Sequence, residues 1–164
     1  MSQDQTYRFG HWGFAQTANA ACRRSAFEQI GGFRESIRAG EDADLTYRLR
    51  EAGWIDQRRE SATVVHRNRQ TLRGFVRQNL DHGAGGAWVH SRYPSAMPPR
   101  RRVGLSWWAV RTVVGGLASA ARRRDRDKAL RALFDPVDEL AYEFGRSLNN
   151  ELPGSPPGGS WAHP

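Results

Sequence analysis

The sequence predicts an α/β fold followed by a C-terminal helical extension. Within residues 17–80, short apolar segments that suit strands alternate with segments of helical spacing. Residues 103–121 and 129–149 each place apolar side chains along one stripe of a long helix. Residues 93–102, rich in proline and arginine, separate the two parts and indicate a linker.

The first helix is predicted after residues 17–24, which themselves suit a short buried strand or a turn. Ser25 and Glu28 have the spacing of a capping box, in which a hydroxyl and a carboxylate each bind a free backbone N–H at a helix start. The pair Gly31-Gly32 then stops this helix, which keeps it short.

Glu41 opens a second predicted helix, with acids in the first turn, where the helix dipole favours negative charge, and Gly53 ends it. Residues 54–55 and 62–65 contain apolar and β-branched side chains and are strand candidates. Thr71 can cap a third helix. Three glycines either break this helix or let a partner approach closely, namely Gly83, Gly85 and Gly86.

Four stretches are expected along the chain. Residues 1–92 form the α/β part, residues 93–102 the linker and residues 103–150 the helical extension. Residues 151–164 are rich in Pro, Gly and Ser, which indicates a disordered linker, and they end in a tag-like tail that we leave out of the fold prediction.

Charge is distributed unevenly over the 164 residues, whose formal net charge is +8. Residues 1–66 are neutral, residues 67–132 carry fifteen basic and three acidic side chains, and residues 133–164 carry one basic and five acidic side chains. The basic stretch favours partners with phosphate groups, such as anionic lipid or a nucleotide diphosphate. Nucleic acid is disfavoured, because aromatic residues are not interleaved with the basic ones.

The single cysteine, Cys22, cannot form an internal disulfide, which fits a reducing compartment. The first residues show neither the basic nor the apolar region of a secretory signal. These observations predict a cytoplasmic protein, and they leave open a peripheral attachment to the inner face of the cell membrane.

The strongest pattern lies in residues 17–66, where four motifs follow one another. They are Thr17-Ala18-Asn19-Ala20-Ala21, Ile30-Gly31-Gly32-Phe33, Gly40-Glu41-Asp42 and Val64-Val65-His66, with Leu45, Arg48, Leu49 and Ala52-Gly53 between the last two. Their order and spacing resemble the second half of the inverting family 2 glycosyltransferases, which have the GT-A fold. The resemblance covers residues 12–92 and implies that the α/β part is a partial GT-A, Rossmann-like mixed sheet with flanking helices.

The resemblance also implies roles for individual residues. An inverting sugar transfer needs a base for the proton of the acceptor hydroxyl, and this role falls to Asp42, with Glu41 positioning the acceptor or tuning Asp42. His66 would bind a divalent cation, Mn²⁺ or Mg²⁺, that stabilises the departing nucleotide. Acids in a first helical turn are more often only dipole partners, so that alternative stays open. The implied substrate-binding residues are Asn19, Gly31, Gly32, Phe33, Arg48, Arg77 and Gln78.

The two Asp-x-Asp pairs, Asp42-Ala43-Asp44 and Asp125-Arg126-Asp127, are not assigned to metal, because the metal-binding pair of the family follows a strand of the nucleotide-binding half. That half would precede Thr17, where the chain has only sixteen residues. The expected partners are therefore a nucleotide-sugar donor, a lipid-linked or saccharide acceptor, and a separate nucleotide-binding half or a homo-oligomer. A fragment, a split enzyme and a degenerate domain are the explanations left open.

A second function stays open, a non-catalytic module or degenerate glycosyltransferase that docks on an anionic membrane or a partner protein through basic helices. Residues 103–121 approach the length of a membrane span, but Arg111 lies in their middle and arginine triplets flank them. The apolar stripe, with Trp107 and Trp108 near one end, fits a helix that lies in the membrane interface. A helix packed on the domain is the alternative.

Overall fold

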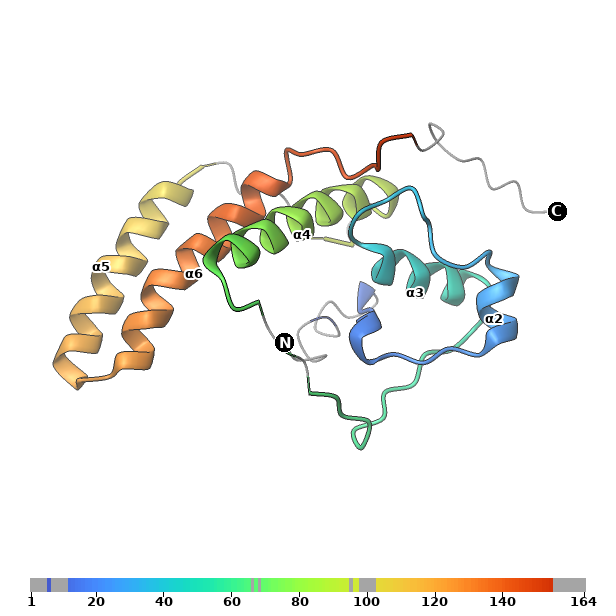
Figure 1. Ribbon diagram of the computed structural model, residues 1–164, viewed down its shortest axis with the longest axis horizontal. Coiled ribbons are helices and arrows are strands. Elements are labelled where there is room, and N and C mark those ends of the chain that lie inside the picture. Colours follow the sequence, from blue (N-terminus) through green and yellow to red (C-terminus); the bar gives the residue numbers. More distant parts are fainter. Residues whose placement is uncertain are drawn as a thin grey trace.

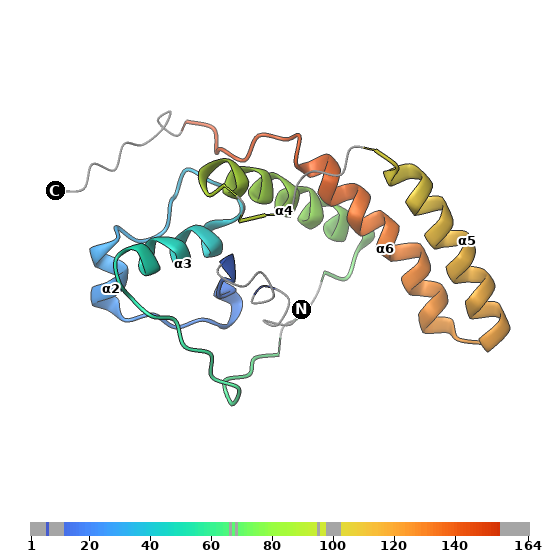
Figure 2. The same ribbon diagram turned by 180° about the vertical axis from the view of Figure 1, so that it is seen from behind.

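The computed structural model describes Thr6 and residues 12–65, 67, 69–94, 96–97 and 103–154. The elements, shown in Figure 1, are a short 3-10 helix η2 (Thr17–Asn19) and the helices α2 (Arg24–Gln29), α3 (Glu41–Glu51), α4 (Leu72–Arg92), α5 (Leu105–Arg123) and α6 (Arg126–Gly145). Helix α6 lies between α4 and α5, and α3 contacts α4. The α5–α6 hairpin projects from the end of the molecule opposite to α2 (Figures 1 and 2).

The predicted mixed sheet is wrong. The described residues contain no strand, and their one β-type contact is an isolated bridge between Ile37 and Glu151. The two strand candidates belong to no helix or strand, and Ile55, Val64 and Val65 are 92%, 53% and 103% exposed. A strand is stable only when a neighbour pairs with its backbone and other residues cover its apolar face. No described segment pairs with these residues, so their local preference for extended backbone does not produce a sheet.

Helix α2 begins earlier than predicted. Arg23 stands at the N-cap without a side-chain bond to the backbone, so the capping box is not formed, and Glu28 instead accepts from Nε of Arg24 at 2.7 Å. The predicted end is confirmed, because Gly31 and Gly32 adopt φ values of 74° and 72° that reverse the chain. The 3-10 helix η2 occupies the segment expected to be a strand or a turn.

The predicted start and end of α3 and the predicted start of α4 are confirmed. Helix α3 begins at Glu41, and after it Gly53, with a φ of 85°, donates its N–H to the carbonyl of Arg50 at 2.9 Å. Thr71 caps α4, since its hydroxyl oxygen accepts from the N–H of Gly74 at 3.1 Å. Local signals were therefore sufficient for these two helices.

The glycines of α4 allow a close helix crossing and do not break the helix, which continues to Arg92. A Cβ atom on Gly83 would collide with the backbone carbonyl of Tyr142 in α6. Gly145 of α6 faces the carbonyl of Leu80 in α4 equally closely. The backbones of the two helices are thus in contact, which joins the expected helical extension to the part of the chain that carries α3.

The second Asp-x-Asp pair contributes a helix cap. Asp125 precedes α6, and its carboxylate accepts from the N–H of Lys128 at 2.9 Å. After α6, the side chain of Asn150 accepts from the N–H of Ala39 at 3.1 Å and donates to the carbonyl of the same residue at 2.8 Å. The expected tail therefore starts against the loop before α3, and residues 155–164 lie outside the described residues.

A small aromatic core supports α3. Ala43 and Tyr47 of α3 pack against Val89 and Tyr93 of α4. The rings of the two tyrosines meet edge to face with centroids 4.9 Å apart, and the hydroxyl of Tyr47 donates to the carbonyl of Trp12 at 2.6 Å. This packing holds the first turn of α3 in a defined place.

Candidate functional site

A wide cleft opens beside the first turn of α3. Its walls come from α3, α4, α6, η2 and the loop of residues 54–64, and its volume is about 1590 Å³. Ordinary small-molecule pockets measure roughly 300–1,000 Å³, so this cleft has room for more than one small ligand. The polar side chains that line it between the three helices include Glu41, Asp42, Gln78, Asn79, His82 and Asp138.

Asp42 is the acid best placed for proton transfer in this cleft. Burial raises its pKa from 3.8 to about 6, and the neighbouring charge of Glu41 adds to the rise. The N–H of Ala43 donates to its Oδ1 at 2.8 Å and opposes the rise without cancelling it. At neutral pH the carboxylate is therefore mostly ionised, yet it binds a proton more readily than an ordinary aspartate, as a general base requires.

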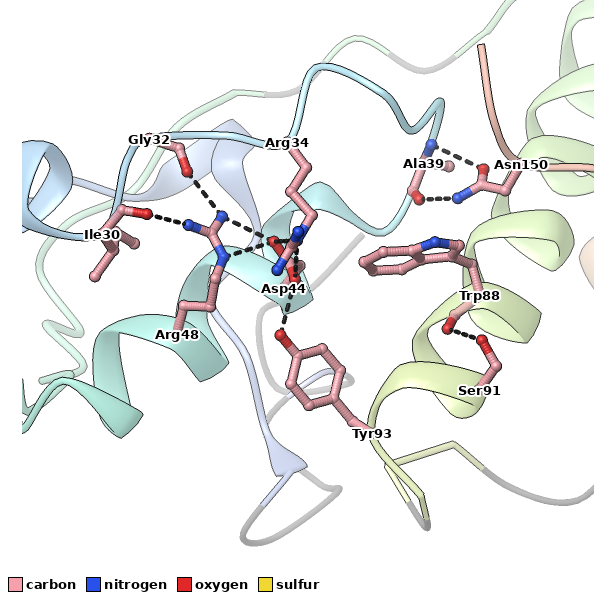
Figure 3. A network of polar contacts seen from close by, with 10 residues as sticks. All are labelled: Ile30, Gly32, Arg34, Ala39, Asp44, Arg48, Trp88, Ser91, Tyr93 and Asn150. Carbon is pink, nitrogen blue, oxygen red and sulfur yellow. Dashed lines mark hydrogen bonds and ion pairs between the residues drawn. The ribbon is translucent and has the colours of Figure 1, made fainter. Parts of the chain in front are cut away.

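The carboxylate of Asp44, two residues further along α3, is occupied by contacts within the protein (Figure 3). Its side chain is completely buried, and it accepts from Nε of Arg34 at 3.0 Å and from Nε of Arg48 at 2.8 Å. The hydroxyl of Tyr93 donates to the same carboxylate at 2.8 Å. Three donors thus surround Asp44, which is how a buried charge is stabilised in a protein.

Arg48, a predicted substrate-binding residue, takes part in this network. Its Nη1 donates to the carbonyl of Ile30 at 2.7 Å, and its Nη2 donates to the carbonyl of Gly32 at 2.7 Å (Figure 3). Both carbonyls belong to the glycine turn after α2. Arg48 therefore ties that turn to α3, a positioning contact that the sequence motif did not reveal.

The structure brings four of the predicted site residues together in the cleft. Glu41 and Asp42 come from α3, Gln78 comes from α4, and Asn19 lies in η2, where its Nδ2 donates to the carbonyl of Ala62 at 2.9 Å. His66 lies outside the described residues. The remaining predicted residues lie outside the lining of the cleft, and they are Gly31, Gly32, Phe33, Arg48 and Arg77.

Two polar cleft residues of α4, His82 and Asn79, were not among the predicted site residues. Burial lowers the pKa of His82 below 6.5, with the nearby acids Asp138, Asp81 and Glu41 opposing the shift, so the ring is mostly neutral at pH 7. The side chain of Asn79 is buried, and its Nδ2 has no hydrogen-bond partner among the described residues. Both lie within about one turn of Gln78 on α4, so their spacing from Gln78 is visible in the sequence. The position of Asp138 beside them is not, because it depends on the crossing of α4 with α6.

No group of three or more His, Cys, Asp or Glu side chains within the described ranges is arranged to hold a metal ion. The predicted ligand His66 is not among those ranges. The divalent cation therefore stays a prediction.

Known proteins with similar sequences connect the chain to sugar transfer. It is 33% identical over 110 residues, 66% of this chain and 23% of the relative, to proteins named pre-mycofactocin glycosyltransferase from two strains of Mycobacterium tuberculosis, CDC 1551 / Oshkosh and ATCC 25618 / H37Rv. It is 32% identical over 102 residues, 62% of this chain and 30% of the relative, to the succinoglycan biosynthesis protein ExoA of Rhizobium meliloti (strain 1021).

The matched residues thus cover less than a third of the length of these relatives. No family model matches it, and no solved structure matches it significantly. The similarity over about two thirds of this chain supports a relationship with glycosyltransferases.

Proposed function

We propose that this chain carries the acceptor side of an inverting, family 2 type glycosyltransferase, in which Asp42 is the general base. One observation carries the proposal: Asp42 stands at the first turn of a firmly packed helix, in an open cleft, with a pKa raised to about 6. The similarity to named glycosyltransferases supports the reaction class. The donor would be a nucleotide-sugar, and the acceptor a saccharide or a lipid-linked saccharide.

In the proposed reaction an acceptor hydroxyl donates a hydrogen bond to the carboxylate of Asp42. As the hydroxyl oxygen attacks the anomeric carbon, Asp42 takes the proton, the bond from that carbon to the phosphate oxygen breaks, and the nucleoside diphosphate leaves with the electron pair. Attack from the face opposite the leaving group inverts the anomeric carbon. Glu41 keeps the proton affinity of Asp42 high through its neighbouring negative charge.

The residues from α4 would hold the acceptor. The buried Nδ2 of Asn79 offers a hydrogen-bond donor that the described residues leave without a partner, and a ligand hydroxyl would satisfy it. The neutral ring of His82 can both donate to and accept from sugar hydroxyls. We assign no described residue to the nucleotide.

The test is the release of nucleoside diphosphate from UDP-glucose and from GDP-mannose by the chain combined with a nucleotide-binding half, with Mg²⁺ or Mn²⁺ and a short saccharide acceptor. Asp42→Asn should lower the rate by roughly 10²–10⁴-fold, the usual contribution of a general base. Asp127→Asn is the matched control, because Asp127 is also an acid in a first helical turn, is exposed and lies outside the cleft. The wild-type rate should rise as the pH passes about 6.

Full turnover in Asp42→Asn would show that Asp42 is not the base. If the wild-type chain releases no nucleotide with any donor even when a nucleotide-binding half is supplied, the non-catalytic binding module becomes the better explanation for this chain.

A further inference from the structure

Helix α5 turns its small side chains towards α6 and its large apolar side chains towards solvent. Ala109 and Ala120 are buried, and a Cβ atom on Gly116 would collide with Ala132 of α6. On the opposite side lies an apolar ridge, whose exposed fractions are 68%, 54%, 63% and 37% for Trp107, Val110, Val114 and Leu117. A helix that faces water on this side would have the reverse arrangement.

The ridge is continuous, because its members are spaced by three or four residues and therefore lie on one helical face. Val103, two residues before the helix, is also 94% exposed. Burying one large apolar side chain at a binding surface raises the binding constant by about tenfold or more. An uncovered row of such side chains therefore indicates a docking surface.

The charge around the ridge selects the kind of partner. Helix α5 contains no acidic residue, and Arg111 and Arg122 are exposed beside the ridge, with Arg123 and Arg124 directly after them. A second copy of the chain docked through this face would bring the arginines of two α5 helices together, and α5 itself carries no acid to pair them, which disfavours self-association. An anionic surface has the complementary charge.

The position of α5 allows contact with a broad flat surface. It is the outermost helix of the projecting hairpin, and α6 separates it from the rest of the molecule (Figures 1 and 2). Within the described residues no helix is both long and apolar enough to cross a bilayer. A helix with one apolar face and flanking arginines can instead lie in the plane of the headgroups.

We propose that the apolar ridge of α5 docks on an anionic lipid membrane, with Trp107 and Val114 at the acyl boundary and Arg111 and Arg122 against the lipid phosphates. This goes beyond the proposed function, because it uses neither Asp42 nor any other residue of the cleft. Docking would bring the chain to the surface where anionic or lipid-linked molecules are found.

The experiment is flotation of the full chain with vesicles of phosphatidylcholine alone or of phosphatidylcholine with about one third phosphatidylglycerol. We expect binding to the anionic vesicles, loss of that binding at high salt, and little binding to phosphatidylcholine. Trp107→Ser combined with Val114→Ser should lower the partition constant by about tenfold or more. Arg111→Glu should lower it by about 30-fold, since each charge near an anionic surface contributes about fivefold.

Two control variants lie away from α5. Val65→Ser removes an apolar side chain that is fully exposed and outside the cleft, and Arg24→Glu reverses an exposed charge on α2. Both should bind as wild type, and circular dichroism should show that every variant keeps its helix content.

Three results would overturn the proposal. The first is equal binding to neutral and anionic vesicles, and the second is wild-type binding by the α5 variants. The third is a dimer in light scattering that Val114→Ser dissociates, because a second copy would then cover the ridge. None of these readouts depends on sugar transfer, so the membrane proposal and the catalytic proposal fail separately.

Discussion

Replacement of Asp42 by asparagine should make the protein more stable at neutral pH, although the same change removes the proposed base. The carboxylate is partly buried beside Glu41, and the N–H of Ala43 only partly compensates the charge. Asparagine has nearly the same size, and its side-chain oxygen can accept the same N–H. The variant therefore removes a charge that the folded state stabilises poorly.

The magnitude follows from the pKa. Burial raises the pKa of Asp42 from 3.8 to about 6, so the folded chain keeps this proton to a higher pH than the unfolded chain does. The ionised carboxylate consequently destabilises the fold as the pH rises through this window. With 1.36 kcal/mol per pKa unit, the cost is about 0.5 kcal/mol at pH 4 and about 3 kcal/mol at pH 7.

Urea unfolding of the wild type and Asp42→Asn at pH 4, 5.5 and 7 measures this difference. The two proteins should be nearly equal at pH 4, and the variant should be more stable by about 3 kcal/mol at pH 7. Asp127→Asn, which changes an exposed acid in the first turn of α6, should show no gain at pH 7. A variant that is less stable than wild type at pH 7, or a gain that does not grow with pH, would refute the reasoning.

Asp44→Asn, in the same helix turn, should destabilise the fold by about 3–5 kcal/mol in urea unfolding, because it leaves two mostly covered arginines without their charge partner. An unchanged midpoint would contradict the network. Gly83→Ala should destabilise the fold by several kcal/mol, because the added methyl group would collide with the backbone of α6. Gly115→Ala should instead stabilise α5 by up to about 1 kcal/mol, because Gly115 has open space around it and alanine favours a helix more than glycine does. Thermal melting of the two alanine variants checks this, and equal shifts would contradict the close crossing of α4 and α6.

Much of the helical structure could be predicted from local signals. Gly31-Gly32 ends α2, Gly53 follows the end of α3 and Thr71 caps α4, as the sequence predicts. These signals act through the backbone conformation or hydrogen bonds of neighbouring residues, so they need no tertiary context. The capping box failed because α2 starts before Ser25, which places the predicted cap inside the first turn.

The sheet could not be predicted in the same way. Ile55, Val64 and Val65 have the side chains of strand residues, but pairing depends on a second segment that lies alongside. The local preference of these side chains indicates only that the segment can adopt an extended backbone. Whether it joins a ladder is a property of its neighbours, and the described residues provide none.

The sequence by itself determined the start and end of α3, the start of α4, the concentration of arginine in residues 67–132 and the apolar stripe of α5. Tertiary structure decided what the residues of these elements do. Asp42 and Asp44 are the same residue in the same helical turn, yet packing placed one in an open cleft and surrounded the other with two arginines and a tyrosine. Likewise, the stripe of α5 faces outward because only its glycine and alanine face is small enough to pack closely on α6. Contacts between residues far apart in the chain govern burial, and burial governs both the pKa of Asp42 and the exposure of the ridge.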